Sequence, residues 1–343
     1  MDNQAFTIAG TTIEPGTKTI LLFPAPSINS QIKTDIPVHV FHGKNAGPKL
    51  FVIGTIHGDE VDSIEIIRRL HKKISLNKLC GTVITVPVAN MYGMIMESRY
   101  LPDRRDLNRS FPGSNSGTLA SRLAYGIMEQ VVSHCQYGID LHTGALGRIN
   151  MPQLRVNLDT PGAKELALAF NTPVVLDAKL RDGSLRAAAS ELGIPLLVYE
   201  GGEALRFNEL CIRSGVLGIT NVLHHLGMLT SRVKKTEKSR AIITNTTRWV
   251  RAPVSGLVQP LHDVLARSVK KNEILAYIHD PFLINDSVEV RAPFDGIVIG
   301  QALKPLASAG DALYNIASFK KMAGVRANIE AFREEITNEG DER

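Results

Sequence analysis

Short apolar runs alternate with segments of helical periodicity over the first two-thirds of the chain. Strands are predicted at residues 49–55, 81–89, 137–141, 173–177 and 194–199. Helices are predicted between them, at residues 60–74, 119–132, 165–170, 184–192 and 217–226. This order predicts an α/β fold, with a mostly parallel mixed sheet covered by helices on both faces. Ligands of such sheets bind beyond the carboxyl ends of the strands.

The pattern changes near residue 245, where short alternating strands and Gly/Pro turns begin. Residues 251–258 (RAPVSGLV) are echoed by 291–298 (RAPFDGIV), and 272–278 by 310–316. Two related halves of this kind predict a small β barrel-sandwich with internal two-fold symmetry. We therefore expect a catalytic domain at 1–245, the sandwich at 246–318 and a charged helical tail at 319–343.

Composition narrows the function classes. The chain has 343 residues, of which 44% are hydrophobic and 21% charged, and no run approaches the ~20 apolar residues of a membrane span. The first residues lack the pattern of a secretory signal. The cysteines Cys80, Cys135 and Cys211 are odd in number and form no CxxC pair, which favours a reducing compartment such as the cytoplasm and argues against a cysteine zinc site.

The net charge of +5 does not indicate nucleic-acid binding, because Lys and Arg are spread along the chain. The densest basic run, residues 232–240, is interpreted as a solvated connector. The expected partner is a small molecule, with neither nucleic acid nor membrane. The sequence leaves the oligomeric state open, and a homodimer is the general expectation.

Two predicted strands are each followed closely by a histidine. His57 opens the HGDE segment, in which Gly58 permits a turn and Glu60 begins a helix, and His142 follows a strand in the DLHTG segment. Imidazole and carboxylate bind zinc, and a catalytic zinc has three protein ligands and a water. Asp140 lies on the same face of its strand as His142, where it can support that ligand. The alternative for HGDE alone is a polar turn with an acid that caps the helix.

Two further segments carry candidate substrate and proton-transfer groups. In the polar loop 102–113, Asn108 offers an amide and Arg109 a planar fork for a carboxylate. The alternative is a solvated loop with ion pairs. The strand at 194–199 ends in Glu200 and a Gly-Gly turn. A carboxylate beside a metal-bound water would be a general base, and Glu200 is preferred to Glu203, which lies past the turn.

Together, the segments HGDE, DLNRSFPG, DLHTG and YEGG resemble the succinylglutamate desuccinylase/aspartoacylase family, a branch of the zinc carboxypeptidase superfamily. The resemblance covers about 190 residues. It implies a zinc carboxypeptidase-like domain with one Zn²⁺ held by His57, Glu60 and His142, and a catalytic base at Glu200. It also implies substrate contacts from Asn108 and Arg109.

The family places a further arginine upstream of DLNR, and Arg99, Arg104 and Arg105 all compete for that role. The C-terminal repeat resembles biotinyl/lipoyl domains. Their carrier lysine would lie near residues 279–282, where this sequence has none, so we predict no lipoylation or biotinylation. We expect this domain to pack beside the active site and to limit substrate size.

The predicted function is a zinc-dependent amidohydrolase, or deacylase, that cuts the amide bond of a small N-acyl amino acid. The nearest alternative is a metallocarboxypeptidase that trims short peptides by the same chemistry. A third alternative is a metal-binding scaffold without activity. The sequence does not identify the acyl group or the amine.

Overall fold

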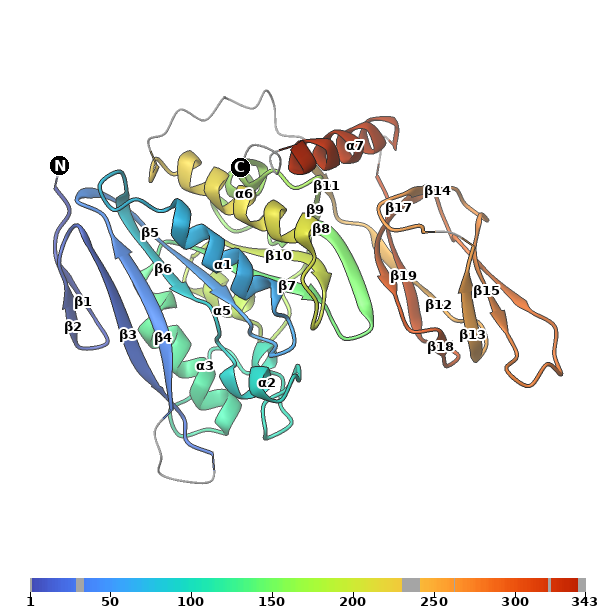
Figure 1. Ribbon diagram of the computed structural model, residues 1–343, viewed down its shortest axis with the longest axis horizontal. Helices are drawn as coiled ribbons and strands as arrows, with labels where there is room; N and C mark the ends of the chain where they lie inside the picture. Colours follow the sequence, from blue (N-terminus) through green and yellow to red (C-terminus); the bar gives the residue numbers. More distant parts are fainter. Residues whose placement is uncertain (1, 29–33, 230–240, 262, 320–321, 339–343) are drawn as a thin grey trace.

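A large mixed sheet runs through the molecule, with helices on both faces and a β-rich C-terminal part at one end (Figure 1). The computed structural model describes residues 2–28, 34–229, 241–261, 263–319 and 322–338. Within them the sheet has 13 strands. The predicted basic connector at 232–240 lies outside the described residues. No described helix is long and apolar enough to cross a membrane.

Four adjacent parallel strands form the centre of this sheet. They are β6 (Cys80–Val86), β5 (Asn45–Gly54), β7 (Tyr137–Gly144) and β10 (Leu196–Glu203), hydrogen-bonded in the order β10-β7-β5-β6. Because all four run in the same direction, their carboxyl ends meet at one edge of the sheet. The residues that follow β5 and the last residues of β7 and β10 are therefore close neighbours.

Further strands, some of them antiparallel to their neighbours, extend the sheet on both sides. On the β6 side lie β4 (Thr34–His42) and β3 (Thr17–Ala25). On the β10 side, β8 (Arg148–Val156) is antiparallel to β10, followed by β9 (Val174–Asp177) and β11 (Ile242–Thr244). A separate hairpin is made of β1 (Phe6–Ile8) and β2 (Thr11–Ile13).

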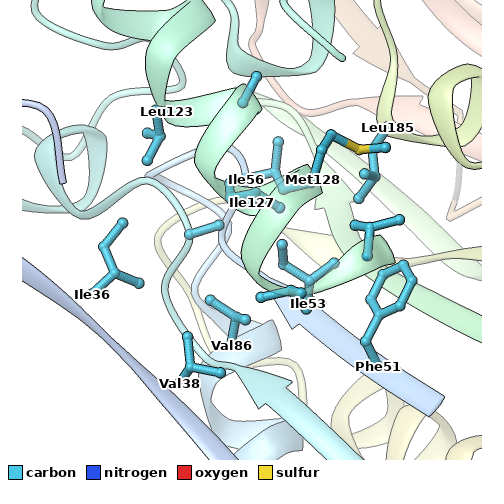
Figure 2. Close-up of a cluster of buried hydrophobic side chains, with 14 of the residues drawn as sticks. Ile36, Val38, Phe51, Ile53, Ile56, Val86, Leu123, Ile127, Met128 and Leu185 are labelled. Atoms are coloured by element: carbon cyan, nitrogen blue, oxygen red, sulfur yellow. The ribbon is translucent and has the colours of Figure 1, made fainter. Parts of the chain in front are cut away.

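The alternation of side chains along β5 divides the core into two layers. Phe51 and Ile53 pack on the face covered by α3 (Leu119–Gln130) and α5 (Leu185–Glu191), and Figure 2 shows part of this layer. Leu50 and Val52 pack on the opposite face, under α1 (Asp62–Lys73), α4 (Ala163–Phe170) and α6 (Glu209–His225). Both layers are fully buried, which fixes the register of the central strands and the positions of their ends.

Three short helical segments lie in the connections. They are α2 (Met91–Ile95) and the 3₁₀ turns η1 (Leu107–Arg109) and η2 (Val132–His134). The turn η1 lies inside the polar loop predicted at 102–113. Its N-cap is Asp106, whose carboxylate accepts a hydrogen bond from the Asn108 N–H.

The C-terminal repeat folds as two sets of four strands, and strands of one set pair with strands of the other. The first set is β12 (Thr247–Arg251), β13 (Gly256–Pro260), β14 (Ser268–Val269) and β15 (Ile274–His279). The second set is β16 (Val288–Arg291), β17 (Gly296–Ala302), β18 (Leu306–Ala307) and β19 (Ala312–Ala317). Strand β12 pairs with β19 as β16 pairs with β15, and β13 pairs with β18 as β17 pairs with β14. The helix α7 (Met322–Asn338) follows.

The α/β fold class, with its mixed sheet and its additional antiparallel strands, is confirmed. Strand β17 also pairs with β8, so one side of the repeat continues the large sheet. Domain limits at residues 245 and 318 stay a prediction.

Some element boundaries differ from those predicted. Strand β10 continues past the Gly-Gly pair to Glu203 through a register shift, because Gly202 adopts φ +81°. Helix α6 begins at Glu209 rather than 217, since the Asn208 side chain caps it by accepting from the Cys211 N–H. Strands β3, β4 and β8 were not predicted.

Candidate metal centre and cavity

The HGDE segment follows β5 at the carboxyl edge of the sheet. Helix α1 begins at Asp62, so Glu60 lies in the turn before the helix rather than at its first position. Gly58 is required for close packing, because a Cβ atom there would lie 1.9 Å from the carbonyl carbon of Gly93. Thr55 has φ +52°, a strained value for a β-branched residue, and its side chain bonds to Ser63 and to the carbonyl of Pro87. The chain therefore turns sharply here and directs its polar groups toward β7.

His57, Glu60 and His142 come together at this edge, and all three are buried. The two Glu60 oxygens lie 2.8 Å from His57 Nδ1 and 2.7 Å from His142 Nδ1. The two Nδ1 atoms are 3.2 Å apart. One ligand atom from each residue lies within 4.8 Å of the other two, so the three side chains can share one ion.

Two more carboxylates fix the orientation of the imidazoles. Asp140 Oδ2 lies 2.9 Å from His142 Nε2, and Asp106 Oδ1 lies 3.2 Å from His57 Nε2. Because carboxylates accept, each Nε2 can donate its proton to an aspartate, and a ring that has no proton on Nδ1 then directs that lone pair toward the same point. The expectation that Asp140 supports His142 agrees with this contact.

The donor set fits a small divalent cation. Two Nδ1 atoms 3.2 Å apart, each beside a Glu60 oxygen, require protons or a cation among them, because facing lone pairs would repel. Two nitrogens that bind one tetrahedral zinc at 2.0–2.1 Å would be roughly 3.3 Å apart, close to the spacing here. Two imidazoles and one carboxylate are also the ligand types of catalytic zinc sites.

The electrostatics of the cluster also favour a bound cation. Burial lowers the pKa of His142, but the Asp140 and Glu60 carboxylates outweigh it and hold that pKa well above its ordinary value. Burial alone would raise the pKa of Glu60, yet attraction from His57 and His142 keeps it far below its ordinary value. The cluster thus holds buried negative charge that attracts positive charge to the Nδ1 atoms.

Glu200 lies on the strand next to His142. The two residues are directly paired across the parallel strands β10 and β7. Glu200 Oε2 accepts a hydrogen bond from Asn150 Nδ2 at 2.8 Å, and Oε1 forms an ion pair with Arg155 Nε at 3.2 Å. Glu203 has a different environment, near Arg206 at 3.8 Å and outside the residues that line the cavity.

The polar loop brings Asn108 and Arg109 to the same place. Both line the cavity, and Asn108 Oδ1 accepts from the Leu185 N–H at 2.9 Å, which holds its amide in position. The Arg109 guanidinium donates to the carbonyl of Asn108. The Asn108 amide nitrogen and the Arg109 guanidinium remain the groups suited to a ligand.

The three competing upstream arginines occupy different positions. Arg99 lines the cavity, donates to Asp106 Oδ2 at 2.9 Å and lies 3.6 Å from Glu60 Oε1. Arg104 and Arg105 do not line it, and Arg105 is 3.8 Å from Asp103. The geometry therefore favours Arg99 over Arg104 and Arg105 as the additional arginine of the site.

These side chains line one cavity of about 360 Å³, within the size range of small-molecule sites. Seven cations line it: Arg99, Arg109, Arg148, Arg155, Lys179, Arg181 and Arg186. Burial and the nearby Arg155 lower the pKa of Arg186 to about 10, so this guanidinium keeps its charge at neutral pH. Trp249 of β12 also lines the cavity, with Arg148 over its ring at 5.1 Å. The C-terminal repeat thus contributes to the wall.

Sequence reasoning missed two residues that hold the site together. Asp106 lies inside the quoted DLNR segment, where its position before Asn108 was the available signal, but the motif alone did not connect it to His57. Asn150 lies on a strand that was not predicted, so no local signal marked it. Arg155, Arg181 and Arg186, which belong to none of the four motif segments, also line the cavity.

Comparisons with known proteins give a consistent result. The model of the succinylglutamate desuccinylase/aspartoacylase catalytic domain matches residues 46–226, more than half of the chain. N-alpha-acetyl-L-2,4-diaminobutyric acid deacetylase from Halomonas elongata is 27% identical over 310 residues, covering 84% of this chain and 87% of that protein.

Among solved structures, a succinylglutamate desuccinylase/aspartoacylase from Rhodobacter sphaeroides superimposes with a TM-score of 0.80 at 26% identity, over 89% of this chain and 96% of the other. The product-bound ectoine utilization protein EutE (DoeB) from Ruegeria pomeroyi gives a TM-score of 0.79 at 25% identity, over 93% of this chain and 100% of the other. The chain therefore belongs to the succinylglutamate desuccinylase/aspartoacylase family of hydrolytic deacylases.

Proposed function

We propose that the protein is a zinc-dependent amidohydrolase that removes the acyl group from a small N-acylated amino acid. One observation carries this proposal. His57, Glu60 and His142 present three ligand atoms within 4.8 Å of one another, with Glu200 on the adjacent strand of the same cavity. Three ligands and a neighbouring carboxylate are the parts that metal-assisted amide hydrolysis requires.

In this proposal His57, Glu60 and His142 are the metal ligands. A divalent ion at this position supplies a Lewis acid for the acyl carbonyl and makes the attacking water more acidic. Asp140 and Asp106 hold the two imidazoles with Nδ1 inward, so that the ligand atoms are in place before the ion binds. Zinc is favoured by the two imidazoles and one carboxylate, although similar ligands accept other divalent transition metals.

Glu200 is the proposed general base. It takes a proton from the attacking water and delivers it to the leaving amine. Its placement opposite His142 in the β7–β10 register puts the carboxylate beside the ligand cluster. Arg99 lies next to Glu60 and is the group of this chain placed to stabilise negative charge on the acyl oxygen.

The cavity wall indicates the substrate class. Asn108 and Arg109 are the proposed substrate-binding residues, and a carboxylate of the substrate is the natural partner of a planar guanidinium. The volume of about 360 Å³ suits an acylated amino acid better than a longer peptide. The relative from Halomonas elongata is named for deacetylation of such a compound. We therefore propose small N-acylated amino acids as the substrate class, and the assay below identifies the acyl group and the amine.

The test is a hydrolysis assay of the zinc-loaded protein with N-acetyl and N-succinyl amino acids beside dipeptides. We expect release of the amine from the acylated amino acids. Preferential cleavage of dipeptides would instead show a metallocarboxypeptidase, and stoichiometric zinc with no hydrolysis would show a scaffold.

The variant Glu200→Gln tests the base, with Glu203→Gln on the same strand as the matched control. Glu200→Gln should retain zinc and lose about 10²- to 10⁴-fold in turnover, because only proton transfer is removed. Glu203→Gln should stay near the wild-type rate. Normal activity in Glu200→Gln would remove Glu200 from the proposed role.

The cellular setting also stays a proposal. The three cysteines are free in the structure, which supports a reducing compartment such as the cytoplasm. We propose a small-molecule substrate as the partner, without nucleic acid or membrane, and the oligomeric state is open to measurement.

A further inference from the structure

A register shift in β8 directs the side chain of Asn150 toward Glu200. In the β8–β10 pairing, Glu200 lies opposite Gln153 and Gly202 lies opposite Asn150, so β8 has one extra residue in this interval. Without it, Asn150 and Arg155 would point to opposite faces, since an odd number of positions separates them. The bulge brings both side chains to the cavity face.

Both oxygens of Glu200 consequently have a neighbour on the same strand, one through a hydrogen bond and the other through an ion pair. Asn150 donates from Nδ2 to Oε2 at 2.8 Å, and Arg155 Nε lies 3.2 Å from Oε1. Asn150 is only 7% exposed, whereas the Arg155 side chain is 31% exposed. A buried neutral donor with a short hydrogen bond constrains the carboxylate more tightly than a partly solvated ion pair does.

The other side of Asn150 faces β17 of the C-terminal repeat. Gly300 is paired directly with Asn150 across the antiparallel β8–β17 ladder. A Cβ atom on Gly300 would lie 2.7 Å from Asn150 Oδ1, and its next contacts, Asn315 Cβ and the Ile149 carbonyl oxygen, are both at 3.6 Å. Glycine at position 300 therefore leaves the space that the Asn150 amide occupies.

We propose that Asn150 is a positioning residue for Glu200, and that β17 sets the place of Asn150 through Gly300. This inference rests on the proposed role of Glu200 as the base. It gives the C-terminal repeat a part in catalysis, because its strand determines where the amide that holds the base can lie. Misplacing a reacting group by about 1 Å can cost 10²-fold in rate.

The first experiment is a double-mutant cycle between Asn150 and Glu200 in the full-length zinc-loaded protein. Asn150→Ala should lower kcat by about 10- to 100-fold and leave KM within about 2-fold, at unchanged zinc content. In the Glu200→Gln background the same substitution should have no further effect on kcat, since residues that act as a unit are not additive. Asn150→Leu, of similar size but without the donor and without a new charge, covers the case in which Asn150→Ala does not fold.

The second experiment is Gly300→Ala, with Gly324→Ala in α7 as the matched control, since a Cβ there meets nothing within 4 Å. We expect Gly300→Ala to lower kcat several-fold in the wild type and to have no effect in the Asn150→Ala background, where the space has been vacated. Gly324→Ala should leave kcat unchanged.

The outcomes separate the two proposals. Normal activity in Glu200→Gln overturns the base itself. Loss of activity in Glu200→Gln with normal kcat in both Asn150 variants overturns only the positioning role. An Asn150→Ala effect that persists at full size in the Glu200→Gln background assigns the loss to general structure and also overturns it.

Discussion

Two pairs of histidines in this molecule have almost the same ring geometry and opposite electrostatics. The ring centroids of His57 and His142 are 4.8 Å apart, and those of His39 and His71 are 4.9 Å apart. Burial lowers the imidazole pKa in both places. In the first pair the pKa values are nevertheless raised, whereas burial and the nearby His39 and Lys18 lower the pKa of His71 to about 4.

The difference comes from the groups around the rings. His57 and His142 are held by carboxylates on both sides, whereas His71 Nε2 lies 2.8 Å from the Thr85 hydroxyl and its ring packs on Phe41. Among the described residues, His57, Glu60 and His142 form a group that could hold an ion, and the His39 pair does not. Ring proximity is therefore insufficient, and the surrounding carboxylates decide whether two histidines attract a cation.

The largest expected contrast is between His142→Ala and His71→Ala. The first removes a proposed ligand, so zinc should be lost on dialysis and hydrolysis should fall to the background rate. The second should retain stoichiometric zinc and near wild-type kcat/KM. Metal analysis beside the hydrolysis assay checks both, and a fully loaded, active His142→Ala protein would break the comparison.

A smaller contrast concerns the groups that orient the rings. Asp140→Asn should weaken zinc affinity by about 10- to 100-fold, because the carboxylate that orients His142 and increases its basicity is removed. Thr85→Val, beside His71, should leave the affinity unchanged. Competition with a chelator of known affinity measures both, and equal affinities in the two variants would show that Asp140 has no such role.

Removal of the metal extends the contrast to stability. A ligand at 100 times its Kd stabilises the folded state by about 2.7 kcal/mol. Chelation should therefore lower the Tm of the wild type and of His71→Ala, and leave that of His142→Ala unchanged. A Tm shift of equal size in His142→Ala would place the ion elsewhere in the protein.

The smallest expected effect is the pH dependence that arises from His71. Its folded-state pKa is about 4 and the ordinary value is 6.5, so between these values the unfolded chain binds more protons. Folding stability should thus fall as the pH drops from about 6.5 toward 4, by less than the full linkage value because the imidazole is half-buried. His71→Gln should lose less Tm between pH 7.5 and pH 5 than the wild type, and an equal loss would contradict the lowered pKa.

Much of the fold and the main candidate residues could be predicted because they depend on local patterns. Apolar runs that lead into His57, His142 and Glu200 mark the carboxyl-terminal parts of strands, and parallel strands bring these parts to one edge. The predicted two-fold symmetry of the C-terminal part agrees with the strand pairing, in which β12 pairs with β19 as β16 pairs with β15. These features require only the periodicity of the chain and the rule for parallel sheets.

The parts of the site that could not be predicted depend on contacts between residues far apart in the sequence, which no local pattern encodes. Asp106 meets His57 from 49 positions away, and the polar loop that carries Asp106 has no periodicity that would predict this contact. Asn150 reaches Glu200 only because β8 has a one-residue bulge, and a single register shift reverses the faces of all the residues beyond it. The choice of Arg99 over Arg104 and Arg105 likewise required the folded loop.

The most direct test of the central claim is anomalous diffraction at the zinc edge from crystals of the zinc-loaded protein. We predict one peak at about 2.0–2.2 Å from His57 Nδ1, His142 Nδ1 and a Glu60 oxygen, with the Glu200 carboxylate facing the open side. A peak bound by other side chains, or no peak at this edge of the sheet in active protein, would contradict the account.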